Sequence, residues 1–199
     1  MEDADHVRVE HETVADTAEK TLDIAERLVQ DRGFNVVSYA DFAAELGITK
    51  AALHYHFSSK ADLGTALITR YTTRFEIALA DIDQRIHDAP AKISAYAGIY
   101  LNVIRQQRMC LCGMLAAEYQ TLPAPMREAV VRFFDINETW LEGVLAAGEK
   151  AGTVHPRGSA RDAARVVIST LEGAMLVARL RDDPSRLEAA KDQLLAELS

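Results

Sequence analysis

The sequence predicts an all-α protein, and three observations support this fold class. Only 10 glycines and 5 prolines are spread over 199 residues, which favours long helices over short strands joined by tight turns. Apolar residues recur at helical spacing from residue 17 onward. Residue types that commonly start and end helices separate these apolar runs. We therefore expect about nine helices in two domains.

The first domain is expected to span residues 14–61, after a flexible acidic tail over residues 1–13 that contains His6 and His11. Its first helix covers residues 17–32 and ends at glycine 33, a residue type that often closes helices. Its second helix is only about two turns long. That helix follows Ser38, a typical N-cap residue, and ends before a second glycine at position 47.

A third short helix follows Thr49, which is again a suitable N-cap. Leu53 and Phe57 share one side of this helix through their i, i+4 spacing, and we expect this side to face the core. At about 100° per residue, the opposite side and the flanks then carry small, histidine and tyrosine side chains. These outward residues are Ala51, Ala52, His54 and Tyr55. A two-turn helix of this kind can enter the major groove of DNA.

Residues 62–199 are expected to form a second, larger domain. Ser59 and Asp62 have the spacing of a capping box, which begins a long helix that ends near His87. Residues 160–180 are apolar around most of the helix circumference, so we expect this helix to be covered on several sides. The other expected helices cover residues 93–104, 113–120, 126–152 and 185–198.

The charge distribution leaves one segment suited to phosphate. The net charge of −8 argues against general binding of nucleic acid. Residues 49–60, however, contain no acidic residue. They carry Lys50, Lys60, His54 and His56 together with hydroxyl side chains, so this segment is a local patch that is compatible with DNA backbone contacts.

Several other classes of protein lack their sequence signals here. The acidic N-terminus has no secretory signal, and no apolar run approaches the length of a membrane span, so we expect a cytoplasmic protein without membrane contact. A helical enzyme is the rival class. The Glu-x-x-His pair of di-iron proteins, the common hydrolase motifs and a phosphate loop are all missing from the sequence, so we expect no catalytic residues, no metal and no cofactor.

The N-terminal motifs resemble those of the TetR family of bacterial regulators. The matching elements are Gly33-Phe34, the short segment 40–50, and the helix that runs through His54-Tyr55-His56 into Phe57-Ser58-Ser59-Lys60. The match is dense over about 50 residues. Two positions depart from the usual pattern: Ala51 replaces a common glycine or proline, and His54 replaces a common tyrosine. These differences leave the operator sequence open.

The resemblance implies a transcriptional regulator rather than an enzyme. Its first three helices form a helix-turn-helix domain that binds DNA, its middle helices enclose a ligand pocket, and its last two helices pair with a second subunit. A two-fold dimer reads a near-palindromic operator. We therefore expect a repressor that a small, mainly apolar effector releases from DNA. The expected DNA contacts are Ser38, Thr49, Lys50, Ala51, Ala52, His54, Tyr55, His56 and Lys60.

The candidate pocket residues combine apolar bulk with a few hydroxyl, amide and indole groups, which suits a small apolar ligand. Aromatic residues at helical spacing are, however, also typical of an ordinary core. The candidates are Tyr96, Tyr100, Met114, Phe133, Phe134, Asn137, Trp140, Thr170 and Met175.

Cys110 offers an alternative mode of regulation. The segment Met109–Glu118 resembles an element of a subgroup of the family that includes sensors of reactive electrophiles. A thiol beside a helix N-terminus has a lowered pKa and forms thiolate more readily, so Cys110 could act as an electrophile or redox sensor. Cys110 and Cys112 could equally be apolar core residues. An internal disulfide between them would be strained.

Overall fold

The computed structural model describes residues 2–199, and it describes side chains from residue 16 onward. In this part of the chain it contains nine α-helices, one 3-10 turn and no strand, so the predicted all-α fold is confirmed. The sequence predicts a flexible tail over residues 1–13, which includes His6 and His11. The side chains of these residues lie outside the part of the chain that the structure describes. The elements are α1 (Glu2–Arg32), α2 (Tyr39–Leu46), α3 (Lys50–His56), α4 (Lys60–Arg85), α5 (Ala89–Ile104), α6 (Leu111–Ala117), η1 (Tyr119–Thr121), α7 (Ala124–Ala151), α8 (Ala160–Leu180) and α9 (Ser185–Leu198).

The helices α2, α3 and α4 start at the caps that the sequence predicts, whereas α1 begins at Glu2 and not at residue 17 as expected. Ser38 forms a capping box, in which its hydroxyl accepts from the Asp41 backbone N–H and its own N–H donates to the Asp41 carboxylate at 2.7 Å. The hydroxyl of Thr49 accepts from the backbone N–H of Ala52 at 3.1 Å. Gly47 ends α2 in the left-handed region at φ +67°, a conformation that costs glycine little.

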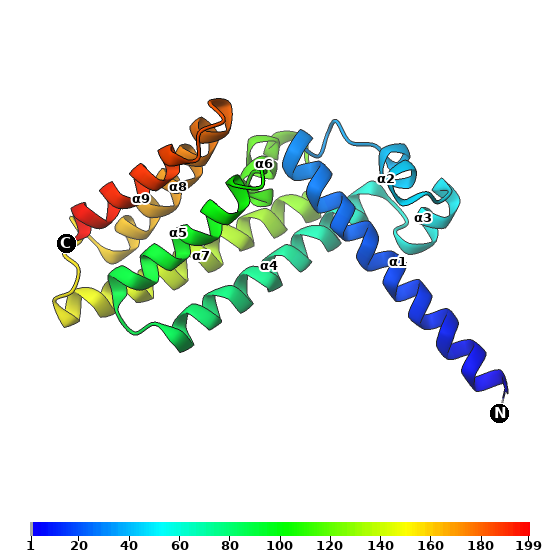
Figure 1. Ribbon diagram of the computed structural model, residues 1–199, viewed down its shortest axis with the longest axis horizontal. Helices are drawn as coiled ribbons and strands as arrows, with labels where there is room; N and C mark the ends of the chain where they lie inside the picture. Colours follow the sequence, from blue (N-terminus) through cyan, green and yellow to red (C-terminus); the bar gives the residue numbers. More distant parts are fainter. Residues whose placement is uncertain (1) are drawn as a thin grey trace.

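Two groups of helices lie at opposite ends of the molecule (Figure 1). The short helices α2 and α3 lie at one end, and α8 and α9 lie at the other, with α4, α5 and α7 between them. The helix α7 packs against α4, α5 and α8, while α9 packs against α5 and α8. One continuous apolar cluster runs from α1 to α9. None of the described helices combines the length and the apolar character needed to cross a membrane.

The C-terminal end of α1 is held by polar side chains from distant parts of the chain. The carboxylate of Glu118, which follows α6, accepts from the backbone N–H of Phe34 at 2.8 Å and of Asn35 at 3.3 Å. Arg179 of α8 donates to the backbone carbonyl of Gln30 at 2.8 Å. Gly33 lies in the left-handed region at φ +88°, and a Cβ there would lie only 2.7 Å from a Glu118 carboxylate oxygen, so this turn favours glycine. These contacts join the N-terminal helices to α6 and α8.

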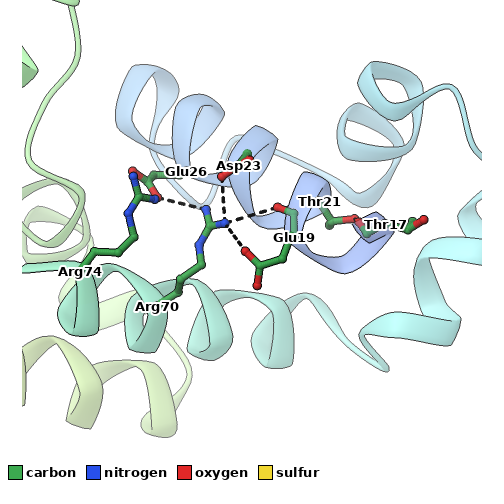
Figure 2. A network of polar contacts seen from close by, with 7 residues as sticks. All are labelled: Thr17, Glu19, Thr21, Asp23, Glu26, Arg70 and Arg74. Atoms are coloured by element: carbon green, nitrogen blue, oxygen red, sulfur yellow. Dashed lines mark hydrogen bonds and ion pairs between the residues drawn. The ribbon is translucent and has the colours of Figure 1, made fainter. Parts of the chain in front are cut away.

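A second attachment joins α1 to α4 through an ion network (Figure 2). The guanidinium of Arg70 contacts Glu19 at 3.0 Å, Asp23 at 2.8 Å and Glu26 at 3.2 Å. Arg74, one turn further along α4, contacts Glu26 at 3.0 Å. The side chains of Arg70 and Glu26 are largely buried, at 14% and 12% exposure, so solvent screens their attraction less than it screens a surface ion pair.

The Glu118 contact predicts a loss of stability when the carboxylate is removed. We expect Glu118→Ala to lower the free energy of unfolding by about 1–3 kcal/mol, because it leaves the Phe34 N–H buried without an acceptor. Urea unfolding of the purified protein measures this. Glu128→Ala, at an exposed glutamate of α7, is the control and is expected to change stability by less than about 0.5 kcal/mol. Equal stability of the two variants would contradict this role of Glu118.

Candidate nucleic-acid interface and the core behind it

The helix α3 presents the outward surface that the sequence predicts. Leu53 is fully buried and anchors the helix. Tyr55 is 77% exposed, and Lys50, Ala51 and Ala52 are also exposed. Thr49 lies at the N-terminal end of α3, where the free backbone N–H groups favour an anion. The small residues and the single projecting tyrosine leave α3 free to approach another molecule closely.

The two histidines of α3 both contact neighbouring aromatic rings. The ring of His54 stacks on Tyr39 with centroids 4.5 Å apart, and its Nδ1 lies 3.2 Å from the Ser58 carbonyl. The Tyr39 hydroxyl donates to the Phe57 carbonyl at 2.7 Å, and partial burial raises the pKa of Tyr39 to about 12. His56 is half-buried and meets the edge of the Tyr55 ring. His54 is therefore exposed but held in one orientation.

Ser38 and Lys60 already have partners within the protein. The Ser38 hydroxyl belongs to the capping box of α2 and also donates to the Asp41 carboxylate at 2.6 Å. The Lys60 ammonium donates to the carbonyl of Phe34 and lies 4.3 Å from the centre of the Phe34 ring. Burial lowers the pKa of Lys60. In place of the free phosphate contact that the sequence suggested, the structure directs Lys60 to the loop that follows α1.

The predicted pocket residues come together as a packed core. Five of them are buried: Tyr96, Tyr100, Phe133, Asn137 and Met175. The hydroxyls of Tyr96 and Tyr100 lie 3.0 Å apart, and Tyr96 donates to the Asn137 side-chain oxygen at 2.9 Å. The amide nitrogen of Asn137 donates to the Phe133 carbonyl at 2.7 Å. The polar atoms of this group therefore satisfy one another.

The other four predicted pocket residues, Met114, Phe134, Trp140 and Thr170, are half-buried. The indole N–H of Trp140 donates to Asp83 on α4 at 2.8 Å, and its ring stacks on Tyr96. Phe134 meets the buried Phe133 ring edge to face. Ring contacts and hydrogen bonds therefore join six of the nine predicted residues into one packed group: Tyr96, Tyr100, Phe133, Phe134, Asn137 and Trp140.

Cys110 occupies the N-cap position of α6, but its thiol is not activated. Its Sγ accepts from the Gly113 backbone N–H at 3.4 Å, as the sequence suggested for a thiol at a helix N-terminus. Burial, together with the nearby Glu172, nevertheless raises the pKa of Cys110 well above its ordinary value. The prediction of a lowered pKa was therefore wrong. Cys112 is also buried with a raised pKa, and both cysteines are free.

Glu172 is a buried carboxyl group that the sequence analysis did not single out. It lies on α8 beside Cys110 and against Gly113, where a Cβ would overlap its carboxylate. One of its oxygens is buried without a hydrogen-bond partner. Burial raises the pKa of Glu172 to about 7, and a hydrogen bond with Cys110 acts in the opposite direction. The sequence does contain a signal for this buried group, because Glu172 is the single acidic residue in the mainly apolar segment 163–178.

Comparison with known proteins places these features in one family. The family described as "Bacterial regulatory proteins, tetR family" matches residues 22–67, and "Tetracyclin repressor-like, C-terminal domain" matches residues 89–194. The chain is 25% identical over 166 residues to the HTH-type transcriptional repressor BepR of Brucella suis biovar 1, covering 80% of this chain and 78% of that protein.

Two solved structures are also similar. A TetR-family transcriptional regulator from Agrobacterium tumefaciens is 31% identical with a TM-score of 0.91, and the match covers 94% of this chain and 99% of that one. A TetR transcriptional regulator from Legionella pneumophila is 33% identical with a TM-score of 0.84, and the match covers 91% and 96% of the two chains. The fold and the length thus agree over nearly the whole of each chain.

The buried Glu172 predicts a stability that falls with rising pH. The Glu172 carboxyl group binds its proton more tightly in the folded protein than in the unfolded chain. The contribution of this proton to the free energy of unfolding is therefore complete below pH 4.5 and is lost as the pH rises through about 7. Above pH 7 the folded protein keeps an ionised buried carboxylate at a cost of about 3 kcal/mol. We expect Glu172→Gln to raise the melting temperature at pH 8 and to change it little at pH 4.5.

Thermal unfolding followed by circular dichroism across this pH range measures the effect. Glu76→Gln, at an exposed glutamate of α4, is the matched control and should leave the pH dependence unchanged. A melting temperature of Glu172→Gln that runs parallel to that of the original protein at every pH would contradict the assignment.

Proposed function

The chain belongs to the TetR family of bacterial regulatory proteins, and we propose that it is a dimeric repressor whose α3 reads operator DNA and whose C-terminal domain responds to a small, mainly apolar effector. The family consists of DNA-binding transcriptional regulators rather than enzymes. The relative from Brucella suis is named a transcriptional repressor, which supports repression. The observation that carries the proposal is the outward face of α3, with a largely exposed tyrosine between small residues.

In this proposal α3 lies in the major groove. Tyr55 and His54 reach base edges or phosphates, and Ala51 and Ala52 allow close approach of the backbone. Lys50 and the N-terminal ends of α2 and α3, at Ser38 and Thr49, contact phosphates. His56 contributes at the edge of the surface through its contact with Tyr55. Lys60 acts indirectly, because its ammonium holds the loop after α1 in place.

The dimer in this proposal forms through α8 and α9. The outward side of α8 exposes Val166, Leu176, Val177 and Leu180, with Leu180 exposed by 79%. Their spacing places them along one side of the helix, opposite the buried residues that pack on α7 and α9. An apolar stripe of this kind is typical of a subunit interface. A two-fold axis through this surface would pair two copies of α3 on a near-palindromic site.

Tyr55 provides the test of DNA recognition. We expect Tyr55→Ala to weaken operator binding by about 1–3 kcal/mol, since a base or phosphate contact is lost, while the stability of the fold is unchanged. The dissociation constant is measured at fixed salt on a duplex selected from a random pool by the original protein. Tyr119→Ala, at an exposed tyrosine of η1, is the control. Equal affinity of both variants would show that α3 does not read the operator.

The α8 stripe provides the test of assembly. We expect the double substitution Leu176→Glu and Leu180→Glu to convert the dimer into a monomer, because it places like charges on both sides of a two-fold interface at a cost of several kcal/mol. Sedimentation at micromolar concentration gives the mass. Ile77→Glu removes an apolar residue of similar exposure from α4 and is expected to leave the dimer intact. A dimer that persists in the double variant would exclude this interface.

A further inference from the structure

A cavity lies at the junction of the N-terminal and C-terminal helices, next to the core that the predicted pocket residues form. Its volume is about 270 Å³, near the lower end of the range for sites that hold small molecules. Residues of α1, α4, α5 and the segment that leads to α6 line it. None of the nine predicted pocket residues lines this cavity. Phe75 of its lining contacts the rings of Tyr96 and Phe133, so the cavity is a candidate ligand site on the α1 side of that core.

The walls of this cavity combine an apolar surface with unpaired polar groups. Phe75, Ile99 and Val103 form its apolar side. Gln30 lies on its α1 side and is only 2% exposed, yet its side-chain oxygen has no hydrogen-bond partner. A buried acceptor oxygen without a donor is costly, so this amide is free to change its orientation when a polar group enters the cavity.

The charged groups at this cavity favour an anion. Arg74 and Arg108 line it together with one acidic residue, Glu26, so the lining carries an excess of positive charge. Within the described part of the chain, the guanidinium of Arg108 has no ion pair or hydrogen bond. The carboxylate of Glu26 is already engaged by both Arg70 and Arg74. A free guanidinium in a fixed fork geometry suits a carboxylate.

We propose that this cavity binds a small amphipathic anion, an apolar molecule that carries one carboxylate. The apolar part contacts Phe75 and Val103, while the carboxylate binds Arg108 and Arg74. The side-chain NH2 of Gln30 donates to the same carboxylate in the flipped orientation of its amide, because an ionised carboxylate only accepts hydrogen bonds. The proposal specifies the class of effector, and the effect of this ligand on DNA binding rests on the proposed function.

The consequence follows from the position of Arg74 in the ion network. Arg74 contacts Glu26 of α1 at 3.0 Å (Figure 2). Both residues line the cavity. A carboxylate in the cavity competes with Glu26 for Arg74 and weakens one of the attachments between α1 and α4. Because α1 packs directly against α2 and α3, such a change alters the placement of the DNA-binding helices.

The binding test uses the full-length protein and three probes of one shape but different charge. These are 3-phenylpropionate, its neutral amide 3-phenylpropionamide, and the cation 3-phenylpropylammonium, with octanoate as a second anion. Isothermal titration calorimetry at millimolar ligand is expected to show saturable binding of the two anions, weaker binding of the amide and none of the cation. Absence of saturable binding by both anions, or equal binding of all three charge forms, would overturn the proposal.

Variants locate the site. Arg108→Gln is expected to weaken the binding of 3-phenylpropionate by about tenfold or more, because it removes a charge-assisted contact. Ala78→Phe places a ring in the cavity and is expected to abolish binding. Arg105→Gln is the control on the same segment, since Arg105 pairs with Glu188 of α9 at 2.7 Å and does not line the cavity. If Ala78→Phe fails to fold, the comparison of 3-phenylpropionate binding by Arg108→Gln and by Arg105→Gln still tests the site.

A DNA-binding measurement separates this site from the proposed function. Release of the selected operator duplex by 3-phenylpropionate, with the release lost in Arg108→Gln, is the expected result. Binding of DNA without binding of either anion would overturn the ligand site and leave the repressor function intact. Binding of the anions by a protein that recognises no DNA would overturn the repressor function and leave the site. Binding that Arg108→Gln does not change would also overturn the site.

Discussion

The C-terminal end of α1 is the point on which the placement of the DNA-binding helices depends. Glu118, which follows α6, accepts from the backbone N–H of Phe34. Lys60 of α4 and Arg179 of α8 donate to backbone carbonyls of the same turn. The end of a helix leaves backbone groups without partners, and burial makes each of them costly. The turn that leads from α1 to α2 and α3 is thus held by side chains from α4, from α8 and from the residue that follows α6.

The helix α1 is held a second time, nearer its middle, by charge. Arg70 and Arg74 of α4 form ion pairs with Glu26 of α1, and Arg70 also pairs with Glu19 and Asp23. The two attachments differ in kind. Hydrogen bonds to backbone groups define the geometry of the turn, whereas the ion network can exchange partners when another charged group approaches. A change of partner at Arg74 therefore acts on the helix that positions α3.

The core behind these attachments shows how burial competes with other electrostatic effects. A helix N-terminus stabilises a nearby anion by about 0.3–2 kcal/mol. Full burial can shift a pKa by about 3–5 units, which corresponds to a larger energy. This difference explains why Cys110 has a raised pKa although it caps α6. The same core tolerates Asn137, because both ends of its amide have partners, and penalises the ionised form of Glu172.

The sequence by itself determined the helical fold class, the caps of α2, α3 and α4, and the inward side of α3. These features depend on residues within a few positions of one another, which is why Leu53 is buried and Tyr55 exposed as predicted. Only the tertiary structure decided that Lys60 binds the Phe34 carbonyl and that Glu118 holds the turn after α1. Periodicity shows which side chains turn inward, but it does not show whether the space they face is filled. Contacts between residues far apart in the chain decide this. Tyr96, Tyr100 and Phe133 are therefore packed core residues, while the cavity lies beside α1.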